Sequence, residues 1–338
     1  MTARDPWSPG ARTDRLTRVL LQSGLSDQAP RELLESYSND AWLVGDAVLR
    51  ICWRGDRGRL VREGLVADSR PTGVPYPDVV ARGETEGFTW LATKRVPGET
   101  LERAWSKMGS GARRRAIERL AEIMRRLHCW VPGSELAAAL SDRPVGAFDD
   151  PEAIAGSDLN PLPIDRALRL AVALAAQPHV DRGLIDEAAR QIEDLRAVDP
   201  FRDKQRTVIH ADIHLANLLW DGSSIAAVLD FEWARFAPPD LELDQLVRAV
   251  ESNRALGVEA AEGEIVRGLR FAYPDLFGHP QLAERLQLYA VTSSLREVTG
   301  WPLTKPEAEL SPEHPVRQLR RLVTEPSAFI DLVSDLAG

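Results

Sequence analysis

The sequence predicts an α/β protein of two lobes, a small antiparallel sheet lobe followed by a larger and mostly helical lobe. Two observations carry this expectation. Short apolar runs separated by turn signals occupy residues 35–96, as is typical of strands. Beyond residue 99, longer segments repeat apolar residues every three or four positions, as amphipathic helices do. We therefore expect residues 1–95 in the first lobe and residues 96–338 in the second.

Length and composition narrow the class of protein. A chain of 338 residues is long enough for one bilobal enzyme. The net charge of −9 argues against a nucleic-acid partner, because neutralising phosphates requires a basic face. No charged leader or membrane-length apolar run is present, so we expect a cytoplasmic protein without membrane contact. Cys52 and Cys129 have apolar neighbours and are expected to be buried, reduced thiols.

The first lobe is expected to contain two helices and a sheet. A helix is predicted over residues 13–24, where apolar residues recur at helical spacing. Residues 35–53 read as two strands with a tight turn at Gly45. A second helix is predicted over 59–69, and a strand over 88–96 runs into a Pro-Gly pair that ends it.

Helices dominate the second lobe. In the helix predicted over 112–130 the apolar residues follow one face, and His128 on that face is expected in the core. Residues 134–163 are polar and rich in turn signals, and read as an insertion over the cleft. Asp240 is expected to cap a helix over 241–252. The other predicted helices cover residues 163–176, 184–198, 259–271, 280–298, 312–324 and 326–336.

The centre of the chain, residues 207–233, combines three short apolar strands with a polar loop. The loop after the first strand carries His210, Asp212 and Asn217, and the third strand ends at Asp230. A polar turn containing glycine joins the second and third strands. Because such a hairpin pairs the start of one strand with the end of the next, we expect Asn217 and Asp230 at the same end of the sheet.

These residues follow the order of groups that phosphoryl transfer requires. Protein kinases have His-Arg-Asp, four residues and then Asn, followed later by Asp-Phe-Gly, whose Asp holds magnesium. The chain keeps this order in His210, Asp212, Asn217 and Asp230, with Glu232 in place of the glycine. Asp212 is the candidate catalytic base and His210 supports its loop. Asn217 and Asp230 offer the oxygen ligands that Mg²⁺ prefers.

A zinc site is the competing interpretation of the same loop. His210, Asp212 and His214 alternate, and an extended segment would point all three in one direction. This interpretation leaves Asn217 and Asp230 without a role, and no other His or Cys lies close in sequence.

The stretch resembles the aminoglycoside phosphotransferase family, the small-molecule branch of the kinase-like fold, in the spacing from Asp212 to Asp230. Residues 237–244 also resemble the family's Gly-Asp-Pro-x-x-Asp-Leu run. The acid of that run braces the catalytic loop in the family, and here it corresponds to Glu242 or Asp244. The resemblance implies a bilobal, protein-kinase-like fold with the nucleotide between the lobes.

The same resemblance implies the groups that hold the nucleotide. Arg50 takes the place of the kinase lysine that grips the α- and β-phosphates, with Glu63 as its partner. Alternatively, Arg50 points to solvent from an edge strand. The turn over residues 36–40 corresponds to the phosphate-covering loop, although it lacks glycine. The hinge residues expected beside adenine are Thr93, in the gatekeeper position, and Lys94 and Val96, through their backbone groups.

The acceptor side is less defined by the sequence. Trp233 is expected to line the acceptor pocket, and Glu232 to line it or to add a distant metal contact. His214 points into the cleft or to solvent. Acidic residues recur over 242–264, where they would attract a polyamine if they faced the cleft, or else form a solvated helix face.

Taken together, the sequence predicts an enzyme that transfers phosphate from ATP (or GTP), with Mg²⁺, to a hydroxyl of a small and cationic acceptor. The acceptor could be an aminoglycoside or another antibiotic, which would make the protein a resistance enzyme, or a metabolite or sugar. The alternative is a non-catalytic nucleotide-binding module. A monomer or a homodimer is expected.

Overall fold

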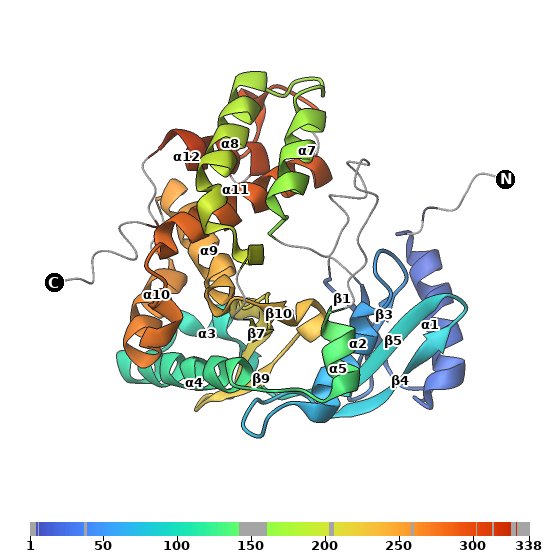
Figure 1. Ribbon diagram of the computed structural model, residues 1–338. Coiled ribbons are helices and arrows are strands. Elements are labelled where there is room, and N and C mark those ends of the chain that lie inside the picture. Colours follow the sequence, from blue (N-terminus) through green and yellow to red (C-terminus); the bar gives the residue numbers. More distant parts are fainter. Residues whose placement is uncertain are drawn as a thin grey trace.

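The first lobe is built on an antiparallel sheet of five strands in the order β1-β2-β3-β5-β4, shown at the lower right of Figure 1. The structure is a computed structural model, and it describes residues 5, 7–36, 39–141, 161–202, 206–257, 260–301, 303–312, 314–325 and 329. The strands are β1 (Arg31–Leu34), β2 (Asp40–Val44), β3 (Ala47–Cys52), β4 (Val79–Thr85) and β5 (Phe88–Lys94).

Helices α1 (Pro9–Ser23) and α2 (Arg59–Ser69) cover opposite faces of this sheet. Side chains alternate along a strand, so β3 presents Leu49 and Ile51 to α1 and presents Arg50 and Cys52 to α2. Burial of an apolar side chain of this size stabilises a fold by roughly 1.5–3 kcal/mol. Strand β3 lies between β2 and β5, so the alternative that Arg50 projects from an edge strand is wrong.

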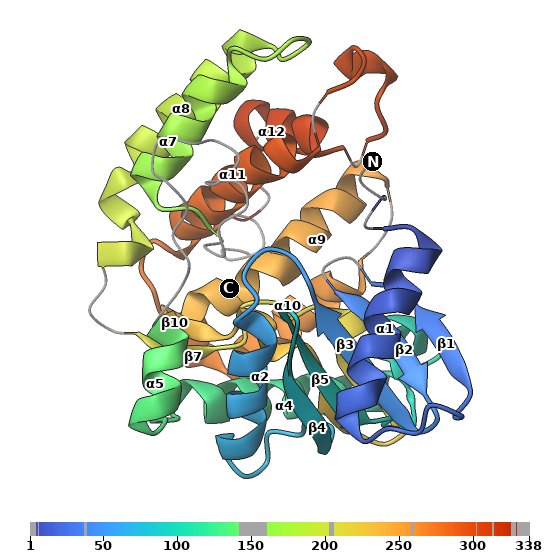
Figure 2. The ribbon, with the colours of Figure 1, turned by 90° about the vertical axis from the view of Figure 1, so that its right-hand side faces the viewer.

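The second lobe contains two apolar cores. The larger core gathers around α4 and α10, and the smaller one joins α7, α8, α11 and α12, which Figures 1 and 2 show at the end away from the five-stranded sheet. No helix in the described part of the chain is long and apolar enough to cross a bilayer. The helices are α3 (Leu101–Trp105), α4 (Ser110–His128), α5 (Ser134–Ser141), α7 (Ile164–Leu174), α8 (Arg182–Asp194), α9 (Asp244–Ala255), α10 (Ala261–Ala272), α11 (Leu282–Gly300) and α12 (Pro315–Thr324).

Two small sheets belong to the second lobe, and their strands flank the polar loop. The predicted hairpin is present, because β8 pairs with β9 and Leu218 stands opposite Val228. The other pairs join β10 to β7 and β6 to β8. The strands are β6 (Glu99–Thr100), β7 (Thr207–Ile209), β8 (Leu218–Trp220), β9 (Ile225–Val228) and β10 (Arg235–Ala237).

The expected fold class is confirmed, and the differences from the sequence prediction are local. Strand β1 was not predicted, since it is short and mostly exposed. Cys52 is buried, but Cys129 is exposed at the end of α4, so the expectation of two buried thiols is wrong for Cys129. Most of the predicted insertion (142–160) and of the helix predicted over 326–336 lie outside the described residues.

Asp240 does not cap a helix, which corrects the sequence prediction. Residues 239–243 form a short 3-10 helix, and α9 begins only at Asp244 without a side-chain cap. Asp240 is instead buried and faces Arg285 of α11, with Oδ2 2.7 Å from Nε and Oδ1 3.0 Å from Nη2. The hydroxyl of Tyr289 donates to the same carboxylate at 2.8 Å. These contacts tie the 3-10 segment to α11.

We expect Asp240→Asn to lower the free energy of unfolding by about 3–5 kcal/mol, because it leaves a buried guanidinium without its counter-charge. Asp68→Asn is the matched control, since Asp68 pairs with Arg82 at the surface and such pairs contribute less than about 1 kcal/mol. Denaturant titration of both variants measures the difference. Equal destabilisation would contradict the structural role given to Asp240.

Candidate active site

The polar loop leaves β7, passes through a short 3-10 helix (Leu215–Asn217) and enters β8. Strand β9 runs back beside β8, and the backbone N–H of Leu229 donates to the carbonyl of Asn217 at 2.8 Å. This bond closes the hairpin one residue before Asp230. Asn217 and Asp230 therefore lie at the same end of the hairpin and line the same cavity.

The side chain of His210 holds the loop together through hydrogen bonds to backbone groups. It is buried, and Nδ1 accepts the backbone N–H of Asp212 at 3.2 Å. The ring proton therefore stands on Nε2, which donates to the carbonyl of Leu229 at 2.8 Å. Its ring also packs against Phe231, with the ring centroids 4.4 Å apart. His210 thus connects the loop to the end of β9, and neither ring nitrogen is left for zinc.

Glu242 braces the loop from the other side, which settles the choice between Glu242 and Asp244. Its buried carboxylate accepts the backbone N–H groups of His210 at 2.5 Å and of Ala211 at 3.1 Å. Ala211 has a left-handed backbone (φ 67°), which costs a non-glycine residue about 1–2 kcal/mol, so the bracing offsets local strain. Burial raises the pKa of Glu242. The nearby His128 and the N–H of His210 lower the pKa by more than burial raises it, so it lies below its usual range.

Asp244 instead pairs with Arg248 on the next turn of α9, with Oδ2 3.1 Å from Nε. Glu242 and Asp244 are both buried, so the acidic run over 242–264 is not one solvated face. Glu264 pairs with Arg113 at 3.0 Å, and Glu259 lies outside the described residues. His128, as predicted, belongs to the core, where Nδ1 meets the Tyr273 hydroxyl at 3.0 Å.

The carboxylate of Asp212 is held by an amide on each oxygen. Gln245 of α9 donates to Oδ1 at 3.0 Å, and Nδ2 of Asn217 donates to Oδ2 at 3.1 Å. His214 Nε2 lies 3.7 Å from Oδ2. Burial raises the pKa of Asp212, but the contacts with His214, with His210 and with Asn217 outweigh it and leave the pKa lowered. Asp212 is therefore held as an ionised, oriented carboxylate.

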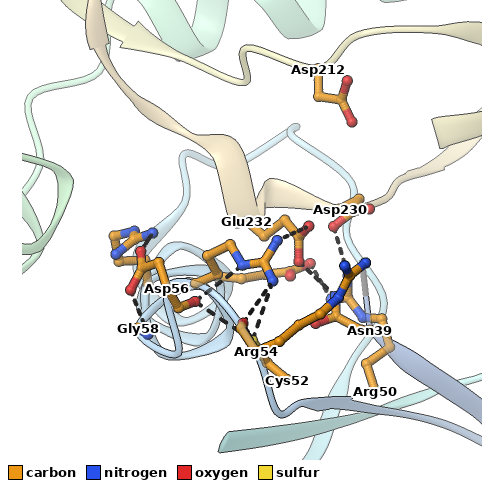
Figure 3. A network of polar contacts seen from close by, with 12 residues as sticks. Asn39, Arg50, Cys52, Arg54, Asp56, Gly58, Asp212, Asp230 and Glu232 are labelled. Atoms are coloured by element: carbon orange, nitrogen blue, oxygen red, sulfur yellow. Dashed lines mark hydrogen bonds and ion pairs between the residues drawn. The ribbon is translucent and has the colours of Figure 1, made fainter. Parts of the chain in front are cut away.

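Arg50 stands between two carboxylates, as Figure 3 shows for Asp230. Its Nη2 forms an ion pair with Glu63 of α2, and Nη1 lies 2.8 Å from Oδ1 of Asp230. Glu63 Oε1 also accepts the Tyr76 hydroxyl at 2.8 Å and the backbone N–H of Phe231 at 3.2 Å. The expected partner of Arg50 is thus in place, and the same guanidinium reaches across to the second lobe.

Asp230 carries an unusual charge environment. Its backbone is left-handed (φ 66°), which turns the chain sharply after β9. Burial raises its pKa most, Arg50 lowers it, and the neighbouring Glu63 and Asp212 raise it again, with a net value of about 6. Burial therefore accounts for most of the rise in the pKa of Asp230, and Arg50 opposes it.

A cavity of about 250 Å³ joins these groups to the hinge. It lies between the five-stranded sheet and the β8–β9 hairpin. Its lining includes seven residues expected from the sequence to contact nucleotide or metal, namely Arg50, Glu63, Thr93, Lys94, Val96, Asn217 and Asp230. At the end of β5 the N–H of Lys94 donates to the Asp78 carbonyl at 2.8 Å, so this N–H is not available to a ligand.

The donor set fits a magnesium ion. Both side-chain hydrogen bonds of Asn217 use Nδ2, to the carbonyl and to Oδ2 of Asp212, and within the described residues its Oδ1 accepts none. Asp230 uses only Oδ1 toward Arg50, and its side chain is 28% exposed. Two oxygens of the kind that Mg²⁺ prefers therefore stand at one edge of the cavity.

Glu232 departs from its expected place. Its side chain is fully buried, so it does not line an acceptor pocket. Trp233 is partly exposed and lies between two guanidinium groups, with Arg59 5.6 Å and Arg296 5.9 Å from the ring centroid. The side chain of His214 is 38% exposed beside Asp212. Lining of the acceptor by Trp233 and His214 stays a prediction.

Three hydrogen bonds of the site were not predicted from the sequence. Gln245 reaches Asp212, Tyr76 reaches Glu63, and Asn39 reaches Glu232. The turn expected to cover the phosphates is only partly described, because residues 37 and 38 lie outside the described range. Amide and phenol side chains at irregular spacing carry no periodic signal, so no pattern in the sequence pointed to these three.

Comparisons with known proteins show the family and the fold of the chain. A sequence model of the phosphotransferase enzyme family matches residues 30–285, more than half of the chain. Among curated proteins, none matches the chain by sequence.

Solved structures of aminoglycoside phosphotransferases have the same fold. The GDP complex of aminoglycoside 2'-phosphotransferase-IIIa is 18% identical, with a TM-score of 0.61 over 96% of this chain and 99% of that one. ADP-bound APH(2'')-Ib is 16% identical, with a TM-score of 0.60 over 95% and 99%. A thermostable mutant of APH(4)-Ia with ADP and hygromycin B is 18% identical, with a TM-score of 0.57 over 95% and 98%. At these identities the likeness establishes the fold, not the acceptor.

The bracing by Glu242 generates a prediction. In Glu242→Gln one carboxylate oxygen becomes an amide that faces a backbone N–H, so we expect a loss of about 1–3 kcal/mol in unfolding free energy. Amide exchange at His210 and Ala211 should accelerate, as measured by hydrogen–deuterium exchange. Glu264→Gln, on an exposed pair, is the control. Unchanged exchange at both amides would show that Glu242 does not hold the loop.

Proposed function

The chain belongs to the phosphotransferase enzyme family, and from this premise we propose that it transfers phosphate from ATP or GTP to a hydroxyl of a small, cationic acceptor. The observation that supports this proposal most is the convergence of Arg50, Asn217 and Asp230 on one cavity, with Asn217 bonded to Asp212. Loose transition states of phosphoryl transfer need positioning and cations more than covalent help. These residues supply both.

Each residue has a defined task in the proposed reaction. Asp212 orients the acceptor hydroxyl and takes its proton, and its lowered pKa keeps it ionised for that purpose. Its two amide partners hold the carboxylate in one orientation. Arg50, fixed by Glu63, binds the α- and β-phosphates. His210 and Glu242 hold the loop that presents Asp212.

Magnesium would be held by Asn217 Oδ1 and Asp230. Bound there, the ion neutralises charge on the phosphate oxygens. Arg50 Nη1 lies 2.8 Å from one oxygen of Asp230, so the guanidinium that would bind the phosphates also partly balances this carboxylate. The adenine or guanine base would lie at the hinge, beside Thr93 and the carbonyl of Lys94. There the N–H of Val96 is unpaired among the described residues and can donate to the base.

A cationic acceptor is supported by two observations. Asp212 and Asp230 bring two carboxylates to the site, and carboxylates attract positive ligands. Solved structures of the same fold contain hygromycin B or kanamycin as well as nucleotide. We keep the lobe boundary at residue 95, a cytoplasmic location and a monomeric or homodimeric state as predictions.

The central prediction concerns Asp212. Asp212→Asn keeps the size of the side chain but removes the base and places an amide against a donor, so turnover with an accepted substrate should fall by about 10²–10⁴-fold. Nucleotide binding should remain close to that of the wild type. Coupled ADP-release assays and calorimetry measure the two quantities separately.

Asp221→Asn is the matched control, because Asp221 accepts only from the turn between β8 and β9. The acceptor is found beforehand by thermal shift with nucleotide, since a ligand at 100 times its Kd stabilises by about 2.7 kcal/mol. Equal turnover of wild type and Asp212→Asn would remove Asp212 from its role. Nucleotide binding without turnover on any acceptor would instead favour a non-catalytic module.

A further inference from the structure

Glu232 lies two residues after Asp230, yet it points into the first lobe. Figure 3 shows it among Asn39, Cys52 and Arg54, with Asp212 apart from this group beyond Asp230. Nδ2 of Asn39 donates to Oε2 of Glu232 at 2.7 Å, and Nη1 of Arg59 lies 3.3 Å from Oε1. All three residues are buried. A carboxylate in such a place requires these donors, since an unmatched buried charge is costly.

Asn39 belongs to the part of the first lobe that covers the nucleotide cavity. It directly precedes β2, and residues Leu34, Glu35 and Ser36 on the preceding segment line the cavity. The next residue, Asp40, is fixed by Arg15 of α1, with Nε 2.6 Å from Oδ2. Asn39 is therefore anchored on one side to α1 and the sheet, and its amide is bound on the other side by Glu232.

Arg59 fixes the start of α2 to the same carboxylate. Besides Glu232, it donates to the carbonyl of Asp56 at 3.1 Å and of Arg54 at 3.4 Å, which holds the turn between β3 and α2. Glu63 lies one helical turn further along α2, on the same face. It accepts the N–H of Phe231 while it holds Arg50. Two residues on one face of α2 thus bind two consecutive residues of the segment after Asp230.

From these contacts we propose that Glu232 is a positioning residue that fixes the nucleotide-covering segment, through Asn39, and helix α2, through Arg59, relative to Asp230. It is not a metal ligand and does not contact the acceptor. The proposal rests on the proposed function, because it assigns a role in placing the nucleotide between Arg50 and Asp230. It replaces the expectation from sequence that Glu232 contacts the metal or the acceptor.

Substitutions separate the hydrogen bond between Asn39 and Glu232 from the ion pair between Arg59 and Glu232. Asn39→Ala removes the donor to Oε2 and leaves the carboxylate with Arg59. Glu232→Gln keeps the shape of the side chain, but its amide then faces a donor on one side. Both variants should bind ADP in the presence of Mg²⁺ about tenfold more weakly, as expected for the loss of one hydrogen bond to a charged group.

The experiment is calorimetric titration of ADP into wild type, Asn39→Ala, Glu232→Gln and the double variant, repeated over a series of Mg²⁺ concentrations. We expect the double variant to bind no more than about twofold more weakly than Glu232→Gln alone, because both changes remove one shared contact. The Mg²⁺ concentration at half-maximal ADP affinity should be the same in all four proteins. Asn253→Ala, in the last turn of α9, is the control for Asn-to-Ala substitution.

Two results would overturn the inference. The first is a higher Mg²⁺ requirement in Glu232→Gln but not in Asn39→Ala, which is the behaviour of a metal ligand. The second is wild-type ADP affinity in Asn39→Ala. If Glu232→Gln does not fold, as judged by circular dichroism, Asn39→Ala decides alone. Failure of the wild type to bind ADP would refute the proposed function itself, and is thereby distinguished from failure of this inference.

Discussion

A carboxylate withdrawn from water must meet a cation or several hydrogen-bond donors, and this requirement governs the junction of the two lobes. Oxygens of Glu63, Asp230 and Glu232 lie within 4.8 Å of one another, among the described residues. Arg50 and Arg59, both from the first lobe, are the cations that meet them. Because Asp230 and Glu232 come from the segment after β9, the ion pairs that neutralise them also join that segment to the sheet and to α2.

The same electrostatics connects structure to the proposed chemistry. Burial raises the pKa of Asp230 most, Arg50 lowers it, and the neighbouring Glu63 and Asp212 raise it again, to about 6. The carboxylate of Asp230 and the amide oxygen of Asn217 line one cavity and are ligands that a divalent ion prefers. On the other side of the hairpin the arrangement is opposite, since Glu242 satisfies backbone N–H groups and amides orient Asp212. On one side of the site Asp230 is placed to bind a cation, and on the other side hydrogen bonds hold the carboxylate of Asp212 in one orientation.

Local patterns in the sequence were sufficient to predict the β8–β9 hairpin, because its strands, its turn and its acids lie close together in the chain. The helix over 59–69 followed from helical spacing, and the Arg50–Glu63 pair from the resemblance to the kinase-like fold. Contacts between distant segments could not be predicted in this way, and Asn39 and Glu232 are 193 residues apart. Asp240 was misassigned for a related reason, since a carboxylate before a helix matches a cap whether or not Arg285 is folded against it.

The most direct test of the account is a crystal structure of the protein with Mg²⁺ and a non-hydrolysable ATP analogue. We predict a metal ion bound by Oδ1 of Asn217 and by Asp230, phosphates within hydrogen-bonding distance of Arg50, and Glu232 still bonded to Asn39 and outside the coordination sphere. An analogue bound elsewhere, or Asn217 and Asp230 turned away from its phosphates, would contradict the central claim that these carboxylates and guanidinium groups form a nucleotide and metal site.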